Sequence, residues 1–446
     1  MSAFPSDFVW GAATSAYQIE GSPLSDGAGP SNWHLFCREP GRILGGDTGD
    51  VACDHYRRYV DDVTLMAELG LQAYRFSVSW SRILPEGRGR LNASGIAFYR
   101  RLVDVLLERG ITPFATLFHW DLPAALAARG GWTHPDCAHW FAEYAQALFR
   151  ELGEGIGHWA TLNEPWVVVD AGYVNGIHPP GERRPDLAPL AAHNLLRGHG
   201  LAVQAFRADG RGEIGLVVNI EPKFAYSNEP ADRSAMERSH AYMNRQFLDP
   251  ALLGSYPEEL EDIYREHWPR FPESDLRLIQ QPIDFVGLNY YSRSVVRDDP
   301  AGDICRVSAV RQSSAQHTAM DWEVFPEGLG SALRWINRRY GDLPLYVTEN
   351  GAAFDDAAGS GPIVDQARLD YLRRHLLAAR SAISDGVPLR GYFVWSLFDN
   401  FEWSYGYGKR FGIVGVDLAT QRRTIKASGR YYADVIRSNG GLLADD

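Results

Sequence analysis

The sequence is poor in cysteine, and its few cysteines stand far apart. Cys37, Cys53, Cys137 and Cys305 form no CxxC pair anywhere in the 446 residues. Closely spaced cysteines are the usual sign of a zinc site or of a disulfide framework. The sequence therefore predicts neither, and it fits free thiols in a reducing cytoplasm.

Long apolar runs are also missing. No stretch of 18 apolar residues occurs, and the first residues, MSAFPSDFVWG, have neither the basic start nor the apolar stretch of a signal peptide. We therefore expect no membrane span, no export by such a signal, and a cytoplasmic location.

Positive charge is scarce as well. The chain has 44 Lys and Arg against 56 Asp and Glu, a formal net charge of −12. An excess of negative charge repels nucleic acids and anionic membrane surfaces. The composition thus predicts no nucleic-acid partner and no membrane partner, and it favours a neutral, polar small molecule.

Apolar side chains, in contrast, are abundant at 45%, which is ample for a large core. Helical stripes of these side chains alternate with short β-rich runs at residues 8–14, 73–78, 111–118, 157–162, 213–219, 283–289, 344–349 and 391–397. Such alternation predicts a parallel sheet, and eight strands close into a barrel. Because no linker or shift in composition marks a boundary, we predict one α/β domain over residues 1–446, a (β/α)₈ TIM barrel.

Three long stretches carry no expected element: residues 21–54, 179–189 and 292–321. They follow the first, fourth and sixth predicted strands. Long βα loops at that face of a barrel shape a pocket.

Two glutamates stand at strand ends. Glu164 lies in TLNEP after the fourth strand, and Glu349 lies in VTENG at the end of the seventh, 185 residues later (349 − 164). In a parallel barrel both point to the face that carries the chemistry. A lone glutamate there is usually a solvated loop charge, but two carboxylates in one cleft divide the roles of proton donor and nucleophile.

Further polar and aromatic residues occupy the other strand ends. They are Gln18, His119, Trp120, Asn163, Asn289, Tyr291, Asn350, Trp395, Glu402 and Trp403. Amides, acids, an imidazole and indoles suit the hydroxyls and the apolar faces of a sugar. Taken singly, a core histidine or a packing aromatic is the better interpretation of each, so the prediction of a sugar site rests on the set.

Arg75 stands inside the predicted strand AYRFSV, where a buried arginine needs a carboxylate partner. Glu349 and an unrelated structural acid are equally good partners on sequence grounds. If the partner is Glu349, we expect Arg75 to lower the pKa of that carboxyl and to keep it anionic.

Six motifs now stand in order along essentially the whole chain: FVWGAATSAYQIEG, HWDLP, TLNEP, GLNYY, VTENG and WSLFDNFEW. Together they resemble glycoside hydrolase family 1, the retaining β-glucosidases. The resemblance implies a (β/α)₈ barrel that acts on β-glucosides or short β-linked oligosaccharides, without a metal ion or an organic cofactor. It implies Glu164 as acid/base and Glu349 as nucleophile.

The resemblance also implies roles for the other residues. Gln18, His119, Asn163, Glu402 and Trp403 would hold the glycone hydroxyls, with Trp395 beneath the sugar. Asn289 and Tyr291 would orient Glu349, Trp120 and Phe411 would line the same subsite, and Trp166 and Trp322 would belong to the aglycone side. Tolerance of β-galactosyl or β-fucosyl groups would depend on Gln18 and Glu402.

Three alternatives remain. In a 6-phospho-β-glucosidase, Glu402 would repel the phosphate, and Lys409 is expected to be a solvated surface charge that gives no rescue. A non-catalytic sugar-binding barrel would have lost one of the two carboxylates. A barrel enzyme for phosphorylated metabolites would carry a glycine-rich loop after the last strands, which WSLFDNFEW does not offer.

Overall fold

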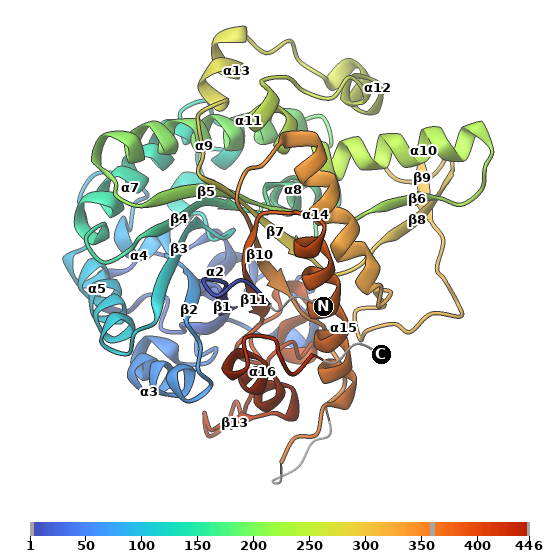
Figure 1. Ribbon diagram of the computed structural model, residues 1–446. Helices are drawn as coiled ribbons and strands as arrows, with labels where there is room; N and C mark the ends of the chain where they lie inside the picture. Colours follow the sequence, from blue (N-terminus) through green and yellow to red (C-terminus); the bar gives the residue numbers. More distant parts are fainter. Residues whose placement is uncertain (1–3, 357–361, 444–446) are drawn as a thin grey trace.

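The computed structural model describes residues 4–356 and 362–443. Eight parallel strands close into a barrel in the order β1-β11-β10-β7-β5-β4-β3-β2 (Figure 1). Their bounds are β1 Val9–Ala13, β2 Ala73–Ser77, β3 Thr112–Phe118, β4 His158–Asn163, β5 Glu213–Asn219, β7 Phe285–Tyr290, β10 Leu345–Asn350 and β11 Leu389–Trp395. The predicted barrel is confirmed, and each strand lies within two residues of its predicted bounds.

Helices cover the outside of the barrel. They include α3 His55–Glu68, α5 Ala93–Glu108, α7 Cys137–Leu152, α9 Ala188–Asp209, α14 Pro326–Tyr340, α15 Gln366–Ser384 and α16 Ala427–Arg437. Their buried side chains follow the spacing of one helical face, as in α5, where Ile96, Tyr99, Leu102, Val103 and Leu106 are buried. Gly70 follows α3 with a φ of 74°, the left-handed conformation that favours glycine after a helix.

The sequence also predicts a helix near residues 233–248, and in the structure this helix is interrupted. It is α10 Pro230–His240, a π-helical turn η5 Ala241–Arg245, and α11 Leu248–Leu253, with α12 Glu259–Tyr264 and α13 Glu273–Ile279 beyond. The turn at η5 carries Tyr242, whose hydroxyl donates to Asp170 Oδ1 at 2.8 Å. A π turn inside a helix often marks a functional position, and this one faces the cavity described below.

Two small sheets lie outside the barrel. The stretch 292–321, for which no element was predicted, contains β8 Ser294–Asp298 and β9 Val307–Ala309. β8 pairs with β6 Lys223–Ala225 on one side and with β9 on the other. This three-stranded sheet lies beside α10, to one side of the barrel (Figure 1). β12 Val414–Val416 and β13 Arg423–Ile425 form an antiparallel pair.

A layer of aromatic rings fills the barrel interior below the strand ends. The ring of Phe114 lies 4.9 Å from that of Phe393 and 5.4 Å from that of Tyr346, which in turn lies 5.3 Å from Phe285. Because these rings come from β3, β11, β10 and β7, they tie opposite sides of the barrel together. The polar residues of the site described below lie directly above these rings.

Asp365 precedes α15 at the expected N-cap position, but its side chain does not cap the helix. It accepts instead from the backbone N–H of Ser428 at 2.8 Å and pairs with Arg368. The carboxylate thus links α15 to α16.

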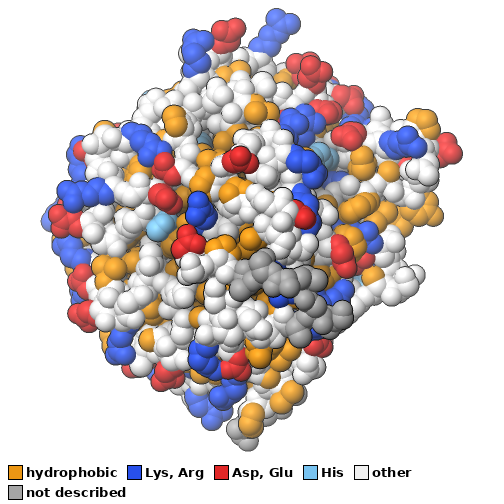
Figure 2. All heavy atoms as spheres, viewed as in Figure 1, with side chains coloured by type: hydrophobic (Ala, Val, Ile, Leu, Met, Phe, Trp, Pro, Cys, Tyr) orange, Lys and Arg blue, Asp and Glu red, His pale blue; other side chains and the backbone are white. Residues whose placement is uncertain are grey.

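The surface carries mixed charge. Figure 2 shows acidic and basic side chains scattered together over one face, with much neutral surface between them. All four cysteines are buried and unbridged. In the described part of the chain, no helix combines the length and the apolar composition needed to cross a bilayer.

Candidate active site

A cavity of about 500 Å³ opens at the carboxyl ends of the barrel strands. Most of the residues predicted for the site line it: His119, Trp120, Glu164, Trp166, Asn289, Tyr291, Trp322, Glu349, Trp395, Glu402, Trp403 and Phe411. Arg75, Asn163 and Gln18 are buried one layer beneath this wall. Strands far apart in the sequence therefore bring the predicted residues into one place.

Glu349 lies near the end of β10 with both carboxyl oxygens hydrogen-bonded. Arg75 Nη1 lies 2.6 Å from Oε1, and the Tyr291 hydroxyl donates to Oε2 at 2.6 Å. The sequence left two equally good partners for Arg75, Glu349 and an unrelated acid. The structure shows that Glu349 is the partner. The second guanidinium nitrogen, Nη2, donates to Asn163 Oδ1 at 2.7 Å.

Arg75 lowers the pKa of Glu349 as expected, but the pKa of Glu349 still lies above its usual value. Burial raises the pKa of Glu349, while Arg75 and the hydrogen bond from Tyr291 pull it down. Side chains only 3% exposed lose most of their hydration, so the arginine offsets a desolvation cost that the sequence does not reveal.

Glu164 directly follows β4, and Pro165 begins α8 Pro165–Val169 behind it. Its φ of 44° is left-handed, which costs a non-glycine residue about 1–2 kcal/mol. Asn289 Nδ2 donates to Glu164 Oε1 at 2.7 Å. Trp120 and Trp403 also have positive φ, 81° and 49°, so backbone strain gathers at this cavity, as is common at functional sites.

The environment of Glu164 favours its neutral form. Burial, followed by the nearby charge of Glu349, raises the pKa of Glu164 to about 8. At neutral pH the larger fraction of Glu164 is therefore protonated and able to donate a proton.

Asn289 connects the two acids. Its Nδ2 donates to Glu164 Oε1 at 2.7 Å and to Asn163 Oδ1 at 3.0 Å, the oxygen that also accepts from Arg75 Nη2. Its own carbonyl oxygen accepts from Thr348 Oγ1 at 2.7 Å, which fixes the orientation of the amide. Asn289 on β7 is thus bonded to Glu164 directly and connected to Glu349 through Asn163 and Arg75.

Glu402 and Gln18 form a polar corner. Gln18 Nε2 donates to Glu402 Oε2 at 3.3 Å and to the Phe401 carbonyl at 2.8 Å, while Ser15 Oγ donates to its Oε1 at 2.6 Å. Gln18 follows the first strand and would be expected at the mouth of the cavity, but it is fully buried, because α1 Ala16–Ile19 places its side chain against the Phe401 carbonyl in the loop after β11. It supports Glu402 from behind.

Burial and the charge of Glu349 raise the pKa of Glu402 to about 8. Lys409 is not a fully solvated charge as expected. It is half-buried, donates to the Ala319 carbonyl at 2.5 Å, and lies over the ring of Tyr405 at 5.6 Å.

His119 directly follows β3 and lines the cavity, with its ring 6.0 Å from that of Trp403. Asn163 Nδ2 donates to His119 Nε2 at 3.1 Å, and its Nδ1 has no partner among the described residues. Burial and the charge of Arg75 hold the pKa of His119 well below its usual range, so the ring is neutral. Trp120 Nε1 donates to the Asn163 carbonyl at 2.9 Å, and the ring of Trp395 stacks 5.8 Å from that of His119.

The chain is similar over almost its full length to one protein family. The profile described as "Glycosyl hydrolase family 1" matches residues 1–441. The chain belongs to glycosyl hydrolase family 1. It is 51% identical over 443 residues to "Beta-glucosidase A" of Thermotoga maritima, a match that covers 98% of each chain.

Solved structures of glycosyl hydrolase family 1 agree. The β-glucosidase from Thermotoga maritima in complex with glucoimidazole is 50% identical with a TM-score of 0.96, over 99% of this chain and 100% of that chain. The same β-glucosidase in complex with galacto-hydroximolactam is 50% identical with a TM-score of 0.95, over 99% and 100%.

The outer half of the family 1 cavity holds residues that were not singled out from the sequence. They are Asp170, Asn219, Glu221, Lys223, Tyr242 and Asp303. Asn219 ends β5 as Asn163 ends β4, so the same strand-end rule would have found it. The others come from loops, from the π-helical turns η4 Asp170–Val174 and η5, and from the short strand β6, where no periodicity signals a site.

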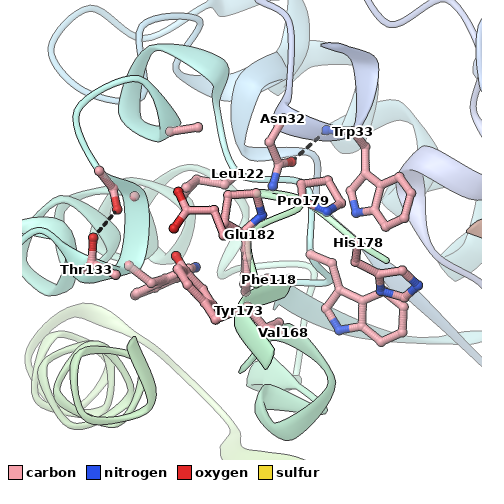
Figure 3. A pocket seen from close by; sticks show the side chains of 16 residues that line it. Asn32, Trp33, Phe118, Leu122, Thr133, Val168, Tyr173, His178, Pro179 and Glu182 are labelled. Carbon is pink, nitrogen blue, oxygen red and sulfur yellow. Dashed lines mark hydrogen bonds between the residues drawn. The ribbon is translucent and has the colours of Figure 1, made fainter. Parts of the chain in front are cut away.

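A second, smaller cavity of about 90 Å³ lies behind this one in the family 1 barrel (Figure 3). Trp33 and His178 close one side of it, and Thr133 lies at the opposite side. Trp120 and His178 line both cavities, so these two side chains separate them.

Proposed function

We propose that the protein is a retaining β-glucosidase that removes terminal non-reducing β-D-glucosyl residues from small β-glucosides and short β-linked oligosaccharides. The observation that carries the proposal is the pair Glu164 and Glu349, two buried carboxyl groups that line one cavity. Asn289 donates a hydrogen bond to Glu164, and Arg75 and Tyr291 donate hydrogen bonds to Glu349. The β-glucosidases among its relatives support the choice of sugar. The proposal treats residues 1–446 as one catalytic domain.

In the first step, Glu349 attacks the anomeric carbon while Glu164 gives its proton to the glycosidic oxygen. The bond between the anomeric carbon and that oxygen breaks, the aglycone leaves as an alcohol, and the sugar remains as an ester of Glu349. Arg75 and Tyr291 hold the attacking carboxylate in place.

In the second step, water attacks the anomeric carbon and Glu164 takes its proton, which releases the sugar and restores Glu349. The change of role follows from charge. Once Glu349 is an ester, the negative charge that raised the pKa of Glu164 is gone, so Glu164 ionises when a base is needed. The chemistry requires only the two carboxyl groups and water.

The remaining predicted residues would bind the sugar. Glu402, supported by Gln18, and His119, supported by Asn163, would receive hydroxyls, Trp395 would lie beneath the ring, and Trp403 would contact its outer edge. β-Galactosyl and β-fucosyl groups are further candidates, and the structural relative that holds a galacto-configured lactam supports the first of them.

Proton NMR of the sugar released from an aryl β-glucoside tests the proposal. We expect β-glucose to appear first and α-glucose only later by mutarotation, because a covalent intermediate requires carboxyl groups about 5–5.5 Å apart rather than the roughly 6.5–9.5 Å of inverting enzymes. Release of α-glucose first would remove Glu349 from the role of nucleophile.

A further inference from the structure

Three carboxylates line the outer half of the catalytic cavity. Asp170 begins the π-helical turn η4 Asp170–Val174 behind α8, Glu221 lies between β5 and β6, and Asp303 lies between β8 and β9. These residues, called here the outer acidic cluster, come from three separate segments of the chain. The pairing of β6, β8 and β9 into one sheet brings Glu221 and Asp303 to the cavity.

Asp170 is held firmly in this wall. Its Oδ1 accepts from the Tyr242 hydroxyl at 2.8 Å, and its Oδ2 accepts from Asn175 Nδ2 at 2.7 Å. Burial and the charge of Asp303 raise the pKa of Asp170 to about 6. At neutral pH it is therefore mostly an anion with a fixed position.

Cations in the neighbourhood neutralise the cluster only in part. Lys223 Nζ pairs with Glu221 and is the one lysine or arginine among the described residues that line the cavity. Arg238, the other cation near Asp303, is engaged by Asp298 at 2.7 Å. The outer acidic cluster with Lys223 thus carries a net charge of −2, from three carboxylates and one ammonium.

A second feature indicates that a hydrogen-bond donor of the substrate belongs here. Asn219 lies at the end of β5, lines the same cavity and is only 7% exposed, yet its Oδ1 has no partner among the described residues. A buried amide oxygen without a donor costs free energy, which a bound ligand can recover. The half-buried ring of Trp166, which lies edge-on to Tyr242 at 5.8 Å, adds an aromatic surface that also favours a cation.

We propose that the outer acidic cluster makes the enzyme selective for the charge of the aglycone: it favours β-glucosides whose aglycone carries an ammonium group, such as an amino sugar or an aminoalkyl aryl group, and disfavours those with a carboxylate. This inference rests on the proposed β-glucosidase function. It adds Asp170, Glu221 and Asp303 as specificity determinants, with Lys223 acting against them.

Three matched substrates test it: the β-D-glucosides of 4-(aminomethyl)phenol, 4-ethylphenol and 4-(carboxymethyl)phenol. The methylene group keeps the charge away from the phenolic oxygen, so the leaving groups stay similar. At low ionic strength and neutral pH we expect kcat/KM to fall from the ammonium to the neutral to the carboxylate compound, with a ratio of roughly tenfold between the extremes that shrinks in high salt.

Two variants of one ion pair give opposite expectations. Glu221→Gln removes a negative charge and lowers the ammonium-to-carboxylate ratio, whereas Lys223→Met removes the positive charge and raises it. Glu237→Gln removes the same charge from the exposed face of α10, outside the cavity, and leaves the ratio unchanged.

A ratio near one in the wild type, or a shift in the same direction for Glu221→Gln and Lys223→Met, overturns the inference while the proposed function stands, provided that the neutral glucoside is hydrolysed. If the wild type hydrolyses none of the three glucosides, the proposed function fails first. If Lys223→Met does not fold, Lys223→Gln takes its place, with the same expected direction.

Discussion

The roles proposed for Glu164 and Glu349 follow from the different environments of their side chains. Replacing Glu349 by alanine removes the proposed nucleophile, and we expect kcat/KM to fall by roughly 10⁴-fold or more for every aryl β-glucoside. Replacing Glu164 by alanine removes the proposed proton donor, which poor leaving groups need and good ones do not. For Glu164→Ala we therefore expect losses of roughly 10²–10⁴-fold with alkyl glucosides and much smaller losses with dinitrophenyl glucosides.

Steady-state rates across phenols of graded acidity provide the measurement. Glu108→Ala, at an exposed position of α5, is the control and retains wild-type rates. Equal losses by Glu164→Ala for acidic and weakly acidic phenols would mean that Glu164 does not supply the proton.

A second prediction at the scale of residues concerns Glu402 and its effect on phosphorylated sugars. Because its pKa is raised to about 8, much of Glu402 is neutral at pH 7, so its repulsion of a 6-phosphate is weaker there than a full negative charge would give. Lys409 does not line the cavity and is engaged by the Ala319 carbonyl. We expect p-nitrophenyl β-glucoside to be preferred over its 6-phosphate, and the preference to grow as the pH rises through 8.

The same comparison on Glu402→Ser is expected to narrow the preference and to flatten its rise with pH. If the wild type hydrolyses both compounds equally well, Glu402 does not contact the outer hydroxyls of the sugar, and the 6-phospho-β-glucosidase becomes the better interpretation.

Most residues that line the inner cavity could be predicted because they share one rule, their position at the end of a barrel strand. Asn219 also lies at the end of a barrel strand, but it was not predicted, because nothing else in the sequence marks this one amide as part of a site. Lys223 begins the short strand β6 and Asp303 lies in the loop between β8 and β9, so neither follows that rule. The net rise of the Glu349 pKa could not be predicted for a related reason: motif spacing does not measure burial.

At the scale of elements, the end of β10 packs closely against the end of β11. A Cβ atom on Gly351 would lie 1.6 Å from the carbonyl oxygen of Trp395. We expect Gly351→Ala to push apart the segments that carry Glu349 and Trp395, lowering kcat/KM by at least roughly tenfold and Tm by several degrees.

Gly157→Ala is the matched control, because a Cβ atom there has nothing within 4 Å. We expect it to keep both wild-type activity and Tm in thermal unfolding and kinetic assays. A fully active Gly351→Ala would show that the two segments can separate without disturbing the site.

Elements with a strong period were predictable, and short ones were not. The strands of the barrel are five to seven residues long and almost wholly buried, so they appear as apolar runs between turn residues. β6 and β9 have three residues each and partly exposed side chains, which give no alternation to detect. The π turn at η5 likewise follows from packing around Tyr242 and not from any local composition.

At the scale of the whole molecule, the raised pKa of Glu164 makes stability depend on pH. The folded state binds this proton up to about pH 8, whereas the unfolded state releases it near its ordinary value of 4.5. The contribution to stability is thus fully present below about 4.5 and is lost as the pH rises through 8. We expect Glu164→Gln to remove roughly 1–3 kcal/mol of this decline in the free energy of unfolding.

Urea denaturation of wild type and Glu164→Gln at a series of pH values measures the difference between the two curves, in which the buried histidines cancel. Parallel curves would show that Glu164 has the same proton affinity in both states.

The barrel is closed by pairing between its first and last strands, β1 and β11, and this has a consequence for the nascent chain. β1 pairs with β11, and Val9 lies opposite Gly391, 382 positions later (391 − 9). A ribosome that adds roughly 5–20 residues per second needs roughly 20–75 seconds to cover that interval. Throughout it, β1 lacks one neighbour and presents an open edge, the kind of surface that chaperones cover. Arg75 likewise has no Glu349 to pair with until translation reaches β10, so catalytic competence arrives only near the close of synthesis.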